Sequence, residues 1–97
     1  MPKRIRDLPA EYLVMQREFA RTIGVRIRER RIALDLTQEQ VRARMELALV
    51  VISRTQYSRI ENGETIPNAA ELIALRNVLG VTTDWLLEGQ KSVVEPT

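Results

Sequence analysis

The sequence contains no cysteine and no histidine, and only four glycines and four prolines among its 97 residues. Without cysteine, disulfide scaffolds, thiol nucleophiles and cysteine-ligated zinc are excluded. Without histidine, the commonest general base and the other usual zinc ligand are missing. A chain of this length buries only about 60 to 65% of its unfolded surface, which leaves little room for a deep catalytic cleft. We therefore expect one small domain that is not an enzyme and holds no metal or cofactor.

Long apolar runs are also missing. No stretch approaches the length of a membrane span, and residues 1–16 lack the uninterrupted apolar core of a signal peptide. These absences predict a soluble, cytoplasmic protein with no membrane partner.

The charges are distributed unevenly along the chain, although the net charge is only +2. Residues 1–34 carry nine basic and four acidic groups, a balance of +5, whereas residues 35–97 carry six basic and nine acidic groups, a balance of −3. This asymmetry favours a basic face that meets a polyanion. A solvated, arginine-rich helix explains it equally well.

Apolar residues recur at intervals of three or four, and helix breakers are sparse, which together predict an all-helical domain. The first stretch forms either one helix from about 9 to 34, or a short extra helix followed by one that begins near Thr22. Further helices are predicted at about 38–48 and 54–61, between Asn68 and Gly80, and after Thr82. Their start signals are Thr37, which forms a capping box with Gln40, and then Ser53, Asn68 and Thr82. Gly63 and Gly80 are the stop signals.

The segments 38–48 and 54–61 predict two helices joined by a turn, the arrangement that places a helix in the DNA major groove. At about 100° per residue, Tyr57 and Ile60 face the core of the domain. The opposite side and the N-terminal tip of the second helix carry Arg54, Thr55, Gln56, Ser58, Arg59 and Asn62. Arginine pairs with guanine, glutamine with adenine, and the threonine methyl packs against thymine. Arg54, Thr55, Gln56 and Arg59 are therefore candidates for base reading.

Several motifs appear in a fixed order: Ile23–Arg28, Leu36–Val41, Ile52–Arg54 with Ser58–Gly63, and Leu79–Val81 with Trp85–Leu87. Together they resemble the XRE family of Cro/C1-type phage-repressor helix-turn-helix proteins over about residues 22–88. The resemblance implies a five-helix, lambda-repressor-like domain whose third helix is the recognition helix. It implies base-reading roles for Arg54, Thr55 and Arg59, and allows Gln56 as a fourth.

The resemblance also bears on the residues around the recognition helix. It places Gln38 and Asn62 where the family grips phosphates, and we add Thr65 and Asn68 as further phosphate-binding candidates. A helix N-terminus favours an anion, which supports this role for Gln38. Arg31 and Glu61 match positions at which the family has a structural ion pair.

The chain departs from the family pattern in three places. Met45–Ser53 is several residues longer than the usual turn, so the second helix either stops before Leu49 or continues through it. Arg42 and Glu46 occupy positions at which the family has small residues; Arg42 can lay its stem along apolar surface. The loop of residues 64–67 lacks the basic residues found in relatives. The basic arm Lys3, Arg4 and Arg6 compensates by lying along DNA, or is a solvated arm that only aids solubility.

These observations divide the chain into a basic arm and helical extension (1–21), a helix-turn-helix domain (22–88) and a short flexible tail (89–97). The apolar residues Tyr12, Val14, Met15 and Phe19 either pack on their own domain, which we favour, or form a dimer contact. A second candidate interface consists of Trp85, Leu86 and Leu87. The expected partners are double-stranded DNA and a second copy of the chain, because two half-sites multiply discrimination.

The sequence thus predicts a sequence-specific, DNA-binding transcriptional regulator, in particular a repressor that reads the major groove with residues 54–61. The alternative is a protein-interaction module, such as an antitoxin that masks a partner protein. The apolar segments 47–52 and 12–19 motivate this alternative.

Overall fold

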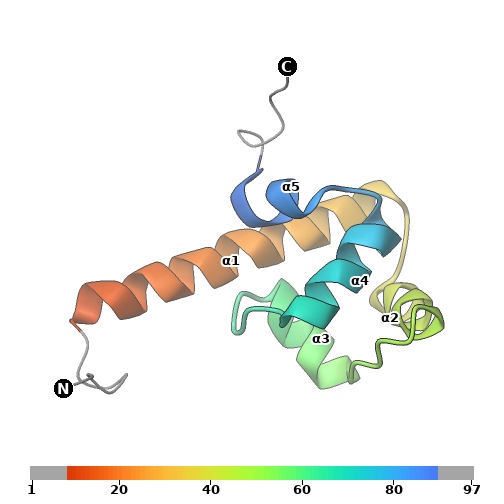
Figure 1. Cartoon of the computed structure of the whole chain (residues 1–97), viewed down its shortest axis with the longest axis horizontal. Coiled ribbons are helices and arrows are strands. Elements are labelled where there is room, and N and C mark those ends of the chain that lie inside the picture. Colours follow the sequence, from red (N-terminus) through yellow and green to blue (C-terminus); the bar gives the residue numbers. More distant parts are fainter. Residues whose placement is uncertain (1–8, 90–97) are drawn as a thin grey trace.

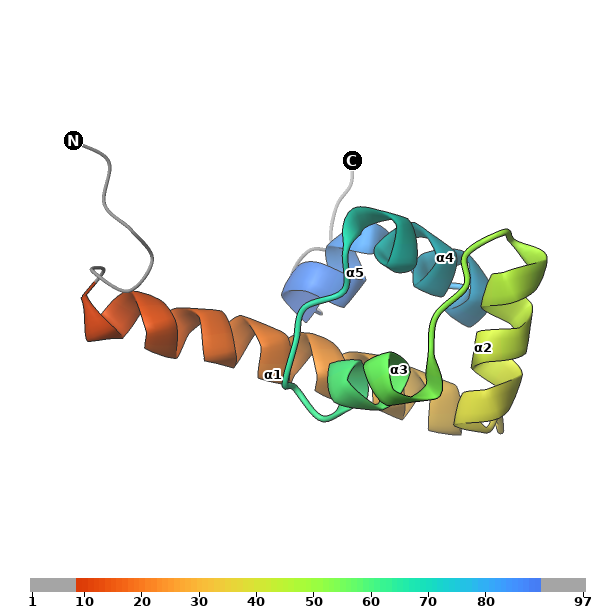
Figure 2. The ribbon, with the colours of Figure 1, turned by 90° about the horizontal axis from the view of Figure 1, so that it is seen from below.

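The computed structural model describes residues 9–89, and the regular structure in that part of the chain is helical. The helices are α1 (Ala10–Ala33), α2 (Gln38–Leu47), α3 (Arg54–Glu61), α4 (Ala69–Leu79) and α5 (Thr83–Glu88). Figures 1 and 2 show how these helices are arranged, with their labels. The predicted all-helical, five-helix class is confirmed. The predicted basic arm Lys3, Arg4 and Arg6, and residues 90–97 of the predicted tail, lie outside the described residues.

The first helix, α1, runs without interruption from Ala10 to Ala33, so the single long helix is the correct alternative. The hydroxyl of Thr22 donates to the carbonyl oxygen of Phe19 at 3.2 Å, a bond within the helix that leaves it continuous. The first half of α1 projects beyond the other helices, as Figures 1 and 2 show. The rest of α1 packs against α3, α4 and α5. The proposed boundary between residues 21 and 22 therefore falls inside a continuous helix.

Local capping sets the start of the other four helices. Each cap accepts a hydrogen bond from the backbone amide of the third helical residue, and the caps are Thr37, Ser53, Asn68 and Thr82. Both Thr37 and Asn68 belong to complete capping boxes. At the other end of α3 and α4, Gly63 and Gly80 adopt φ values of 75° and 66°. These caps and stops lie where the sequence predicts them.

One apolar cluster joins all five helices. Its largest fully buried side chain is that of Tyr57, which projects from α3 into the centre of the domain. Around it lie Ile23, Ile27, Leu36, Val41, Met45, Ile52, Ile60, Ala74, Leu75, Leu79 and Leu86. Because Leu86 is completely buried in this cluster, its predicted place in an interface with Trp85 and Leu87 is wrong.

Three arginines of the basic N-terminal third hold the domain together. Arg26 Nη1 donates to the carbonyl oxygen of Leu86 at 3.0 Å, and Arg30 Nε donates to that of Leu79 at 2.8 Å. These bonds satisfy carbonyl groups in the last turns of α5 and α4, where a positive charge also complements the helix dipole. Arg31 pairs with Glu61. Some of the excess positive charge in residues 1–34 therefore stabilises the fold and is not available to bind a polyanion.

The connector between α2 and α3 begins before Leu49, which is one of the two alternatives that the sequence left open. Leu49 adopts a φ of 67°, in the left-handed region, so α2 stops at Leu47 and does not continue through Leu49. Arg42 Nε donates to the carbonyl oxygen of Ile52 at 3.1 Å, and Arg42 Nη1 donates to Glu39 at 2.9 Å. The buried side chain of Ile52 anchors the end of the connector in the core. The end of the longer turn that leads into α3 is therefore held by a hydrogen bond and by packing in the core.

The close approach of α1 to α3 depends on Gly24. A Cβ atom at this position would collide with the backbone carbonyl oxygens of Ile60 and Glu61. Only glycine lets the two backbones approach so closely. This contact fixes the C-terminal end of α3 against α1. The polar side of α3 faces solvent.

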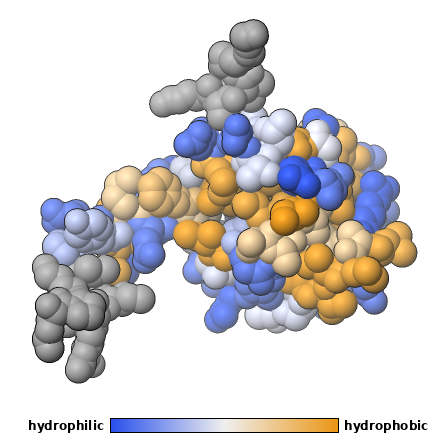
Figure 3. All heavy atoms as spheres, viewed as in Figure 1, coloured by the Kyte–Doolittle hydropathy of each residue, from blue (hydrophilic) through white to orange (hydrophobic). Residues whose placement is uncertain are grey.

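The exposed apolar side chains of residues 9–89 include both of the apolar segments that the sequence analysis identified. On the first half of α1, the side chains of Tyr12, Val14, Met15 and Phe19 are between 48 and 57% exposed, so the prediction that they pack on their own domain is wrong. In the connector region, Leu47, Leu49 and Val51 are 84, 91 and 77% exposed. Figure 3 shows apolar side chains gathered on the face that carries the connector and α4. No helix in the described part of the chain is both long and apolar enough to cross a membrane.

Candidate nucleic-acid interface

A polar groove lies between α3 and the first residue of α2. Its lining consists of Gln38, Arg54, Thr55, Ser58, Arg59, Asn62 and Glu64. Five of these residues are predicted DNA contacts, and the structure brings them together from two helices and a helix end. The other two, Ser58 and Glu64, are additional. No large apolar side chain lines the groove.

The helical repeat of α3 explains why its polar side is exposed. Tyr57, Ile60 and Glu61 are buried against the domain, while Arg54, Thr55 and Arg59 are exposed. The cap at Ser53 accepts a hydrogen bond from Gln56 N at 3.0 Å and fixes the start of the helix. The groove therefore presents guanidinium, hydroxyl and amide groups, which are the side chains that pair with base edges and phosphates.

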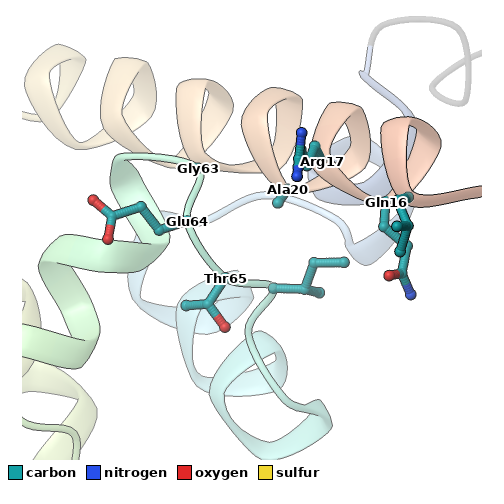
Figure 4. A pocket seen from close by; sticks show the side chains of 8 residues that line it. Gln16, Arg17, Ala20, Gly63, Glu64 and Thr65 are labelled. Carbon is teal, nitrogen blue, oxygen red and sulfur yellow. The ribbon is translucent and has the colours of Figure 1, made fainter. Parts of the chain in front are cut away.

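Three predicted contact residues lie elsewhere. Gln56 is half-buried and is not part of the groove lining. Thr65 lines a different hollow, between α1 and the loop after α3, which Figure 4 shows from close by. Asn68 caps α4, and its side-chain oxygen accepts a hydrogen bond from Glu71 N at 2.8 Å. The sequence could not place Thr65 because the path of a loop is not periodic, whereas the capping position of Asn68 was itself predicted.

Behind the groove, the buried carboxylate of Glu61 links three helices. Arg31 Nε and Nη2 donate to its two oxygens at 2.7 and 3.0 Å, which is the ion pair that the family resemblance implies. Tyr57 Oη donates to Glu61 Oε2 at 2.5 Å, and Gln38 Nε2 donates to Glu61 Oε1 at 3.0 Å. The Glu61 side chain is 1% exposed and that of Arg31 is 14% exposed. The pair is therefore shielded from water, and its charge is satisfied by several donors.

These donors determine the ionisation of the carboxyl group. Burial by itself would raise the pKa of Glu61, but hydrogen bonds from Arg31, Tyr57 and Gln38 outweigh burial, and the pKa lies below its ordinary value. Burial raises the pKa of Tyr57 well above its ordinary value, and the adjacent Glu61 carboxylate adds to this shift. Near neutral pH, Glu61 is thus an anion and Tyr57 a neutral donor.

The position of Gln38 in this network was not anticipated. The sequence identified Gln38 as the first residue after a cap, whereas its hydrogen bond to Glu61 depends on how α2 meets α3. A side-chain amide has two N–H groups, and Glu61 occupies one of them. The second N–H can serve an acceptor in the groove, and the hydrogen bond fixes the orientation of the amide.

Glu64 is the groove residue that sequence reasoning missed. Gly63 N donates to Ile60 O at 3.1 Å and Glu64 N donates to Arg59 O at 2.9 Å, the pattern of a Schellman motif. This motif places Glu64 next to Arg59, and Arg59 Nε lies 3.7 Å from Glu64 Oε1. The signal was present in the sequence, because a helix stop at Asn62–Gly63 brings the residue after the glycine back toward the last turn.

Comparison with known proteins agrees with this arrangement. The helix-turn-helix family model matches residues 27–86, which is more than half of the chain and covers every residue of the groove. No curated protein and no solved structure matches the chain. The matched region extends from within α1 to within α5. From its sequence motifs, its five helices and this match, the chain belongs to the XRE type of the helix-turn-helix family and is a DNA-binding regulator of that type.

Proposed function

We propose that this protein is a sequence-specific transcriptional repressor that reads the major groove with α3. The observation that carries the proposal is the groove itself, where seven polar side chains from α2, α3 and the loop after α3 line one surface. Two arginines, Arg54 and Arg59, lie at the tip and on the free side of α3. A repressor needs no chemistry, because a protein bound at a promoter obstructs the polymerase.

Base reading is assigned to Arg54, Thr55 and Arg59. Each is exposed on α3 and lines the groove. Arginine pairs bidentately with guanine, and the threonine methyl packs against the methyl group of thymine. The half-buried Gln56 is at the edge of this surface and is a weaker candidate than its neighbours.

Phosphate binding is assigned to Gln38 and Asn62. Gln38 begins α2, where free backbone amides and the positive end of the helix dipole favour an anion. Its amide is held by Glu61, which leaves one N–H for a phosphate oxygen. Thr65 and Asn68 are not carried into this assignment, because they do not line the groove. We also assign contacts with the sugar-phosphate backbone of DNA to the arm of Lys3, Arg4 and Arg6.

The proposed repressor acts as a homodimer. One helix of eight residues reads only a few base pairs, and two half-sites about 34 Å apart multiply the discrimination. Sedimentation equilibrium measures the oligomeric state directly. The variant Phe19→Ser tests whether the exposed side of α1 forms the dimer interface.

Selection of bound sequences from a random duplex pool tests the proposed function. We expect a palindrome with fixed half-site spacing, together with affinity that falls steeply as salt rises. Recovery of no preferred sequence, with binding insensitive to salt, would contradict the proposal.

A second candidate function has its own observation. The exposed side chains of Leu47, Leu49 and Val51 form an apolar surface beside α3 that DNA binding does not need. Such a surface favours a protein-interaction module, for example an antitoxin that masks a partner. Salt separates the two functions, because an apolar protein contact persists at concentrations that release DNA.

A further inference from the structure

The groove contains one exposed carboxylate, that of Glu64, among the groups that face a polyanion. The other acid nearby, Glu61, is buried and paired with Arg31. Glu64 is 56% exposed and Arg59 is 58% exposed, so their ion pair lies in solvent and is weak. Of the residues that line the groove, two are arginines and one is this glutamate. The acid therefore halves the charge that the lining directs at DNA.

The backbone fixes where this carboxylate lies. The Schellman motif joins Glu64 N to Arg59 O at 2.9 Å, and the positive φ of Gly63 turns the chain back toward α3. Figure 4 shows the Glu64 side chain directed toward α3 and away from Arg17 on α1. Its partner is accordingly Arg59, whose Nε faces Glu64 Oε1 at 3.7 Å.

With Glu64 beside it, Arg59 should bind a guanine more favourably than a phosphate. A guanidinium has five N–H donors, and bidentate pairing with guanine uses only two. Arg59 can therefore keep its Nε beside Glu64 while its terminal groups bind guanine. A phosphate that binds Arg59 instead brings its own negative charge close to the Glu64 carboxylate, whereas the edge of a guanine carries no net charge. The second arrangement is disfavoured by repulsion between the carboxylate and phosphates.

We propose that Glu64 is a positioning residue for Arg59 that lowers the affinity for non-cognate DNA more than the affinity for the cognate site. The inference rests on the proposed function, because it concerns the same groove. In this proposal Glu64 makes no favourable contact with DNA, but it increases the ratio of the affinity for the cognate site to the affinity for non-cognate DNA. That ratio, and not the bare affinity, determines occupancy of a regulatory site among many competing sites.

The test compares Glu64→Gln with the unaltered protein, on the duplex recovered by selection and on a scrambled duplex of equal length. Loss of the carboxylate should raise affinity for the scrambled duplex about fivefold and steepen its salt dependence by about 0.9 in log–log slope, equivalent to one more phosphate contact. Affinity for the selected duplex should rise about twofold at most, so the ratio falls. Glu64→Asp keeps the charge and should retain most of the discrimination.

The matched control is Glu29→Gln, which changes the net charge equally at an exposed position on α1 outside the groove. It should leave the ratio unchanged. The inference is overturned if Glu64→Gln raises both affinities by the same factor, if it leaves scrambled-duplex binding unchanged, or if it weakens the selected duplex alone. Failure of the unaltered protein to bind any duplex would instead overturn the proposed function.

Discussion

Gln38 Nε2 donates a hydrogen bond of 3.0 Å to Glu61 Oε1, so the first residue of α2 is tied to the last residue of α3. The same carboxylate accepts hydrogen bonds from Arg31 on α1 and from Tyr57. One buried anion therefore sets the relative positions of the two helices that form the groove. The candidate DNA surface depends on this network for its shape, although Glu61 itself is not exposed to DNA.

Removal of the carboxylate should destabilise the fold. In Glu61→Ala, Arg31 keeps its charge in a site that is 14% exposed and loses its partner, which should cost about 3 to 5 kcal/mol of unfolding free energy. Urea denaturation followed by circular dichroism measures the change. Glu18→Ala, which breaks an exposed pair with Arg21, is the control and should not measurably alter stability. Equal stability of Glu61→Ala and Glu18→Ala would show that the buried network is dispensable.

The same network should make stability depend on acid. The pKa of Glu61 is lower in the folded chain than in the unfolded chain, so its contribution is present above the unfolded value of about 4.3 and is lost as pH falls through the folded value. The difference in unfolding free energy between the unaltered protein and Glu61→Gln should thus be constant from about pH 5 to 8 and shrink below about pH 4. A difference that stays constant down to about pH 2 would contradict this assignment.

Base reading and phosphate binding should respond differently to mutation. Arg54→Ala should cost about 1 to 3 kcal/mol on the selected duplex and relax preference at one base position, whereas Gln38→Ala should weaken all duplexes alike. Gel-shift titrations on selected and random duplexes measure both effects. A thermal melt of Gln38→Ala is needed beside them, because Gln38 also bonds Glu61. Equal losses for both variants on both duplexes would disprove the division of roles.

Arg42 should stabilise the long connector. Arg42→Ala removes the donor to the carbonyl oxygen of Ile52, whose side chain is buried, and should cost about 1 to 2 kcal/mol of unfolding free energy. Arg44→Ala, at an exposed position on the same helix, should change stability by less than about 0.5 kcal/mol. Because the connector leads directly into α3, Arg42→Ala should also weaken binding to the selected duplex. Unchanged stability and binding would mean that the core alone holds the connector.

The helices and the polar face of α3 were predictable because their signals are local. Each helix cap accepts a hydrogen bond from the backbone amide only three residues further along the chain; the caps are Thr37, Ser53, Asn68 and Thr82. Glycine at positions 63 and 80 permits the positive φ that ends a helix. The face of α3 follows from helical periodicity alone. The end of α2 near Leu49 was not predictable in this way. Leu49 adopts a left-handed conformation that leucine rarely adopts, and the hydrophobic pattern of the sequence does not reveal it.

The sequence by itself therefore determined the five helices, most of their boundaries and, apart from Gln56, the set of side chains that faces away from the core on α3. Only the tertiary structure decided what the charged and apolar residues between them do. Arg26 and Arg30 satisfy helix ends, Gln38 meets a buried carboxylate, and the apolar side of α1 projects into solvent. Each of these outcomes depends on where helices distant in the chain cross, and neither composition nor periodicity encodes the distance between two such helices.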